Sequence, residues 1–104
     1  METIKKFINH EFNFDFYNGN GVNSKGMVIK RCKIIRIDWD DFRDGELQFT
    51  YEEKRGFNEN ELEVSSTWDF IKKKGNGYKI YFDDDVVFIN EKGEIEKTMD
   101  AFFE

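Results

Sequence analysis

Proline is absent from this chain of 104 residues, and cysteine, histidine and alanine each occur once. The single cysteine, Cys32, excludes an internal disulfide, and no cysteine–histidine cluster offers the ligand spacing of structural zinc. His10 is the one candidate base for a Ser-His or Cys-His nucleophile, and we interpret Cys32 as core filler and His10 as a surface residue. No apolar run reaches the ~18 residues of a membrane span or forms a secretory signal, so we expect a cytoplasmic protein with no membrane contact.

Motifs for cofactor and metal chemistry are also missing. Neither the Gly-x-Gly-x-x-Gly nor the Walker spacing occurs. A calcium loop starting at Asp40 fails, because Phe42 and Tyr51 occupy positions that require ligands. The run 83–85 offers three carboxylates for Mg²⁺ or Ca²⁺, but an acidic turn that is merely solvated is the commoner reading. We therefore expect no metal, no cofactor and no enzymatic activity.

The apolar residues that are present favour strands. Two leucines and one alanine stand against ten isoleucines, five valines and twelve phenylalanines, so β-branched and aromatic side chains dominate. A bias of an AT-rich genome towards phenylalanine and isoleucine would give the same composition, and periodicity has to decide. Alternation supplies that second argument.

Several segments alternate apolar and polar residues. Residues 46–52 place Leu47, Phe49 and Tyr51 on one face, and residues 61–70 place five residues from Leu62 to Phe70 on one face. Segments 62–71 and 78–83 flank a glycine-rich turn and should pair antiparallel. Further strands are expected at 86–90 and 94–96. In the candidate strand 27–39 the apolar face is interrupted, which predicts a bulge or an edge near Lys33.

The two ends of the chain carry weak helical signals. Ile4, Phe7 and Ile8 have helical spacing and precede an alternating segment at 12–16, which predicts a short N-terminal helix leading into a strand. A C-terminal helical turn at 98–103, with Thr98 as its cap, should press Met99 and the following phenylalanines onto the sheet. We predict one domain over 1–104, of α+β class and mostly antiparallel: a small curled sheet or barrel-like roll of about six short strands.

Negative charge is concentrated near the C-terminus. Residues 83–104 hold eight acids and two lysines, which accounts for the whole net charge of −6, whereas residues 1–82 are balanced. A second acidic group surrounds Trp39 and Phe42. Hydration alone explains such a face, but acids interleaved with aromatic residues are also typical of a surface that meets a basic groove on another protein. The candidate partner-binding residues are Asp38, Trp39, Asp40, Asp41, Phe42, Asp83, Asp84, Asp85, Glu91 and Glu94.

These observations favour a non-enzymatic binding protein. The principal hypothesis is a phage or mobile-element inhibitor, of anti-restriction or anti-CRISPR type, that occludes the basic nucleic-acid site of a host nuclease and does not itself bind nucleic acid. One alternative is a toxin-neutralising immunity protein. Another is a small β-barrel that binds RNA or single-stranded DNA through the basic segment 30–36 and tyrosines such as Tyr78 and Tyr81. A barrel with an apolar ligand cavity, and a homodimer through an edge strand at 27–37, are further alternatives.

Overall fold

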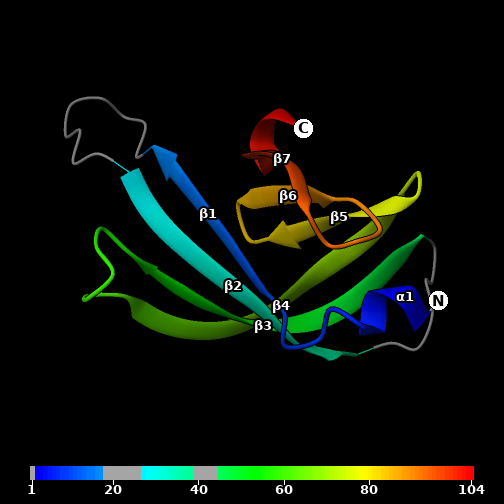
Figure 1. Ribbon diagram of the computed structural model, residues 1–104, viewed down its shortest axis with the longest axis horizontal. Coiled ribbons are helices and arrows are strands. Elements are labelled where there is room, and N and C mark those ends of the chain that lie inside the picture. Colours follow the sequence, from blue (N-terminus) through cyan, green and yellow to red (C-terminus); the bar gives the residue numbers. More distant parts are fainter. Residues whose placement is uncertain (1, 18–26, 39–44) are drawn as a thin grey trace.

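In the part of the chain that the structure describes, seven antiparallel strands follow one another both along the sequence and across one sheet (Figure 1). The computed structural model describes residues 2–17, 27–38 and 45–104. Each strand pairs with its sequence neighbour, and the sheet curls into a nearly closed, barrel-like form. The strands are β1 (Glu11–Tyr17), β2 (Met27–Ile37), β3 (Glu46–Gly56), β4 (Glu63–Lys74), β5 (Gly77–Phe82), β6 (Asp85–Ile89) and β7 (Ile95–Asp100).

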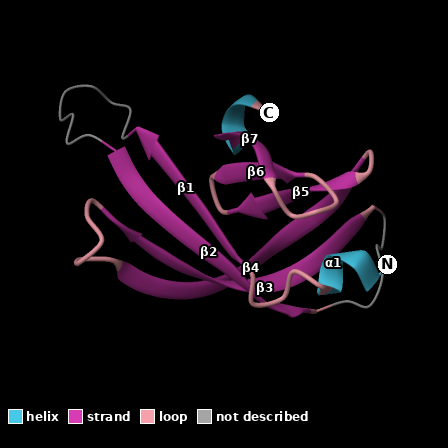
Figure 2. Cartoon of the chain, viewed as in Figure 1, coloured by secondary structure: helices cyan, strands magenta, loops and turns pink. Residues whose placement is uncertain are grey.

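The predicted α+β class is wrong, because the described residues are almost entirely β (Figure 2). Helical structure there is limited to the turn α1 (Glu2–Lys5) and the 3-10 turn η1 (Ala101–Phe103). Asn9 adopts a left-handed φ of 70° and its N–H donates to the Ile34 carbonyl, which turns the chain into β1. A helix confined to one turn cannot repay its nucleation cost, so α1 depends on tertiary packing.

The core lies inside the curl. The predicted inner face of β3 is confirmed, since Leu47, Phe49 and Tyr51 are all buried. The ring of Phe82 lies edge-on to Phe49 and Tyr51, with centroids 5.7 Å and 5.0 Å away. Ile4 of α1 and Phe7 of the turn that follows it belong to the same cluster, so core packing explains their apolar spacing.

Strand pairing confirms some expectations and corrects others. β4 pairs antiparallel with β5, as the alternation and the glycine turn predicted. The register of β2 against β3 shifts between Ile34 and Arg36, close to the bulge expected near Lys33. However, β2 is hydrogen-bonded to β1 on one side and β3 on the other. The expectation that 27–37 forms an edge strand is therefore wrong.

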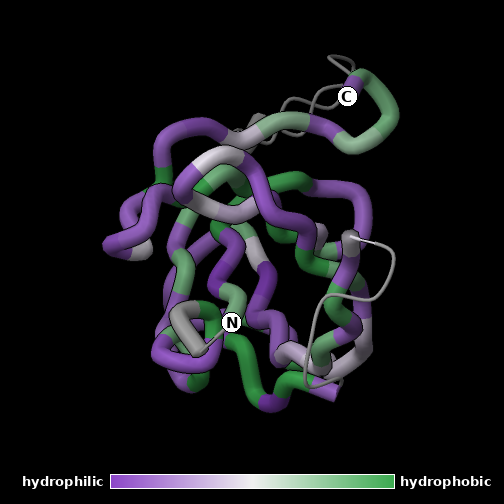
Figure 3. Tube along the Cα trace, turned by 90° about the vertical axis from the view of Figure 1, so that its right-hand side faces the viewer, coloured by the Kyte–Doolittle hydropathy of each residue, from purple (hydrophilic) through white to green (hydrophobic). Residues whose placement is uncertain are grey.

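The C-terminal turn also differs from the expectation. β7 continues to Asp100, whose side chain, and not Thr98, caps η1 by accepting from the Phe102 N–H. Phe102 and Phe103 remain 86% and 75% exposed, so they do not press onto the sheet. In Figure 3 this end of the chain, next to the label C, lies at the periphery of the molecule. None of the described helices has the length and apolarity to cross a bilayer.

Candidate functional site

The outer face of β4 carries apolar residues that the core does not absorb. Thr67 and Asp69 pair with the buried residues Tyr51 and Phe49, so the odd-numbered residues of β4 point inward. The alternate residues therefore point outward, although they form the apolar face of the sequence pattern. Val64 is 60% exposed and Trp68 is 54% exposed. A strand with its apolar side in solvent marks a candidate contact surface.

One long edge of β4 lacks a partner strand in the described part of the chain. β3 pairs with β4 from Glu63 to Lys72, whereas β5 pairs only from Ile71 to Lys74. The edge from Glu63 to Trp68 is therefore hydrogen-bonded on one side only. Lysine, proline or a bulge commonly protects such an edge, and residues 64–68 contain none of them.

Acidic side chains lie at both ends of this edge. Glu63 begins the strand, and at the other end Asp69 accepts hydrogen bonds from the N–H of Phe70 at 2.8 Å and of Asp83 at 2.9 Å. The second bond holds the β5–β6 turn beside β4, where Asp83 and Asp84 are exposed. Burial raises the pKa of the Asp69 carboxyl, against the lowering effect of these two bonds. We call Val64, Trp68, the edge 63–68 and the acids Glu63, Asp69, Asp83 and Asp84 the β4 surface.

A buried ion cluster lies next to the β4 surface inside the curl. Lys30 is fully buried, and its Nζ lies 2.6 Å from an Asp85 oxygen and 3.0 Å from a Glu53 oxygen. It also donates to the Phe82 carbonyl at 3.0 Å. β2 and β6 are separated by three strands in the sheet, so the Lys30–Asp85 pair crosses the interior. Burial lowers the pKa of Lys30, but the hydrogen bond and charge of Asp85, helped by Glu53, outweigh it and raise the pKa overall.

Two acids predicted near the partner site lie at the other end of the β6 strand. Glu91 and Glu94 occupy the β6–β7 turn, and Asp83–Asp85 lie at the opposite end of β6. The five residues of this strand separate the two groups by about 13 Å. Asn90 donates to Glu94 at 2.8 Å. The structure therefore separates these two groups of predicted residues.

The second predicted acidic group is largely outside the described residues. This applies to Trp39, Asp40, Asp41 and Phe42. Asp38 is described, and it accepts hydrogen bonds from Arg36 at 2.6 Å and from the Thr50 hydroxyl at 3.0 Å. Its charge is thus partly compensated by its own sheet.

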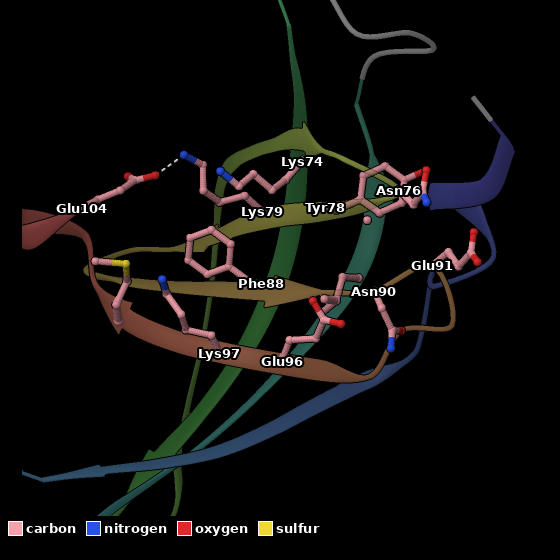
Figure 4. A pocket seen from close by; sticks show the side chains of 13 residues that line it. Lys74, Asn76, Tyr78, Lys79, Phe88, Asn90, Glu91, Glu96, Lys97 and Glu104 are labelled. Atoms are coloured by element: carbon pink, nitrogen blue, oxygen red, sulfur yellow. Dashed lines mark hydrogen bonds and ion pairs between the residues drawn. The ribbon is translucent and has the colours of Figure 1, made fainter.

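A groove of about 760 Å³ lies on the outer face of β5–β7 (Figure 4). Phe88 lies between two ammonium groups, Lys97 Nζ at 4.9 Å and Lys79 Nζ at 5.9 Å from the ring centroid. Lys79 also pairs with Glu104, which accepts a hydrogen bond from the Tyr81 hydroxyl at 2.6 Å. The lining includes three lysines and three glutamates: Lys74, Lys79, Lys97, Glu91, Glu96 and Glu104. Balanced charge does not favour a polyanion there.

The surroundings of Cys32 and His10 bear on whether these residues could act as a nucleophile and its base. Burial raises the pKa of the Cys32 thiol, which keeps it protonated and works against a nucleophilic role. The His10 ring is exposed and lies edge-on to the rings of Phe12 and Phe7, at 4.7 Å and 5.9 Å. No three His, Cys, Asp or Glu side chains of the described residues converge on a metal position.

Comparison with family models, curated proteins and solved structures gave no match for this chain. The site therefore rests on its own geometry. Of the β4 surface, the sequence pointed to Asp83 and Asp84 as candidate residues but not to Glu63, Trp68 and Asp69. The signal for them was in the pattern of 61–70, where one face is polar throughout, yet the sequence does not say which face meets the core.

Proposed function

We propose that this chain is a non-enzymatic binding module that holds a basic segment of another protein against the β4 surface. The observation that carries the proposal is that the side chains of Val64 and Trp68 point outward into solvent, on a strand edge with acidic residues at both ends. Exposed apolar side chains supply contact energy, whereas the surrounding carboxylates steer a basic partner and select against acidic ones.

The chemistry of the partner follows from the charges. Of the acids nearest the β4 edge, Asp85 and Glu53 are committed to Lys30, but Glu63, Asp83 and Asp84 are exposed and able to meet lysine or arginine. Proteins expose clusters of such cations where they hold nucleic-acid phosphates. A module that covers one of these clusters excludes nucleic acid, so the proposal extends to an inhibitor of a nucleic-acid-processing enzyme.

Two triple variants with equal loss of charge test the proposal. The first, Glu63→Gln with Asp83→Asn and Asp84→Asn, neutralises the β4 surface. The second, Glu91→Gln with Glu94→Gln and Glu96→Gln, neutralises the same number of acids near the other end of β6. Wild type and both variants are immobilised and used to capture proteins from a host-cell lysate at low and high salt. The nucleic-acid binding of a captured protein is then measured while increasing amounts of this chain are added.

We expect wild type and the second variant to capture the same protein at low salt and to release it at high salt, because screening weakens exposed charge pairs. The first variant should bind this protein at least about tenfold more weakly, which corresponds to a loss of about 1.4 kcal/mol or more of binding free energy. Equal capture by both variants contradicts the placement of the contact. Retention of single-stranded oligonucleotides by wild type in a low-salt gel shift contradicts the class of partner.

A further inference from the structure

We propose that the partner binds by strand addition, with an extended segment pairing along the free edge of β4 from Glu63 to Trp68. This inference rests on the function proposed above and adds the mode of binding. Within the described residues no strand pairs with this edge over 63–68, so the backbone N–H and C=O groups of alternate residues remain available to one added strand. Val64, Thr67 and Trp68 also have side chains typical of strands.

The two faces of the edge determine the sequence pattern of the added strand. On the inner face, Glu63, Ser65, Thr67 and Asp69 lead to the exposed acids of the β5–β6 turn. On the outer face, Val64 and Trp68 are exposed. Directly opposed side chains of an antiparallel pair contact each other, so the added strand should carry Lys or Arg on its inner face and apolar residues on its outer face. The occupant is therefore a segment of alternating basic and apolar residues.

Charge opposes a second copy of this chain as the occupant. Antiparallel pairing of two β4 edges about a two-fold axis at Ser66 places Glu63 of one copy opposite Asp69 of the other, because both side chains point to the inner face. Like charges would then approach at both ends of the paired segment, which is destabilising. Arg55, which pairs with Glu63 in the β3–β4 register, is one cation at this end of the edge.

The probe is an octapeptide of alternating lysine and valine, titrated into the intact chain by calorimetry. An octapeptide of four lysines followed by four valines has the same composition and charge but lacks the alternation. A third peptide of alternating glutamate and valine keeps the strand pattern and reverses the charge. We expect the first peptide to bind at least about tenfold more tightly than either control.

Backbone N-methylation separates strand addition from simple charge attraction. In one version of the probe the backbone nitrogen of every valine is methylated. In the other version the backbone nitrogen of every lysine is methylated. Each version blocks one edge of the peptide, so one should lose about tenfold or more in affinity and the other should retain it. Hydrogen exchange of the intact chain should show new protection of backbone amides within 63–68.

Equal affinity of the two methylated peptides, or protection confined to residues outside 63–68, overturns strand addition. If the triple variants behave as expected while this result is obtained, the proposed function stands and the mode of binding fails. Failure of the alternating peptide to bind overturns the inference as well. A dimer seen by light scattering without peptide, and lost on changing Thr67→Lys, would replace the basic segment with a second copy.

Discussion

Lys30 shows how a single residue fixes the arrangement of distant strands. Its ammonium group is removed from water and is surrounded by Asp85, Glu53 and the Phe82 carbonyl, with the Phe14 ring 5.8 Å away. Removing a charge from water is costly, and well-placed partners offset this cost. The pairing also gives a reason for one orientation of β2 against β6, because another register would leave the three charges unpaired.

Replacing Lys30 alone should be strongly destabilising. We expect Lys30→Met to lower the free energy of unfolding by about 3 kcal/mol, because Asp85 and Glu53 would lose their partner in a mostly buried site. Urea unfolding followed by circular dichroism measures the loss. Adding Glu53→Gln and Asp85→Asn to Lys30→Met should restore more than half of it. A loss for Lys30→Met no larger than that for the exposed control Lys92→Met would contradict the role of the ion cluster.

Trp68 should matter to binding and little to folding. Its ring is more than half exposed and packs edge-on to Phe70 with centroids 5.5 Å apart. We expect Trp68→Ala to change stability by no more than about 1 kcal/mol. The same change should weaken the alternating lysine–valine peptide by about tenfold or more, since exposed tryptophans are frequent binding hot spots. Phe102→Ala, at a more exposed aromatic outside the β4 surface, is the matched control and should leave peptide binding unchanged.

At the scale of the elements, the β4–β5 hairpin contains two glycines with different physical requirements. Gly75 has a left-handed φ of 60° and open space where a side chain would lie. At Gly77 a Cβ would lie 2.0 Å from the Ile89 carbonyl oxygen of the neighbouring strand. The first glycine satisfies a turn conformation, and the second permits the close approach of β5 and β6.

The two glycines give a matched pair of variants. Gly75→Ala should cost about 1 kcal/mol of stability, the strain of a left-handed alanine. Gly77→Ala should cost about 3 kcal/mol, because backbone atoms of β6 must move. Thermal and urea unfolding of both variants measure the difference. Equal losses would show that Gly77 is not a packing constraint.

Alternation predicted the strands well and predicted their faces unevenly. In β3 the apolar residues from Leu47 to Tyr51 face the core, as expected. In β4 the same reasoning points the wrong way, because pairing of Thr67 with Tyr51 turns the polar residues inward. Periodicity states which residues share a face, but the register with neighbouring strands decides which face is buried. The single turn α1 illustrates the same limit, since Ile4 and Phe7 have helical spacing for reasons of core packing.

At the scale of the whole molecule, charge is concentrated in the sequence and divided in space. Four of the eight acids of 83–104 have partners within the protein: Asp85 with Lys30, Glu94 with Asn90, Asp100 with the N–H of Phe102, and Glu104 with Lys79 and Tyr81. Asp83 and Asp84 gain significance from Glu63 and Asp69, which lie outside that segment. Counting charges along the sequence identifies the acidic β5–β6 turn. It does not identify the β4 surface, because the curl of the sheet is what brings Asp69 of β4 next to that turn.

Three buried protonated groups on β2 and β3 predict a loss of stability in alkali. Burial raises the pKa values of Cys32 and Tyr51, and the pKa of Lys30 is raised despite its burial because of Asp85 and Glu53. Since the folded protein holds these protons more tightly than the unfolded chain, the stability they contribute is complete below the unfolded pKa values and lost as pH rises through the folded ones. Each group contributes a slope of up to about 1.4 kcal/mol per pH unit, beginning near the unfolded pKa of about 8.5 for cysteine and about 10 for tyrosine. Urea unfolding from about pH 7 to about pH 11 should show this decline. The Cys32→Val variant should lack the part of this decline between about pH 8.5 and about pH 10. If its free energy of unfolding fell with pH as steeply as that of wild type over this range, the contribution of the thiol would be refuted.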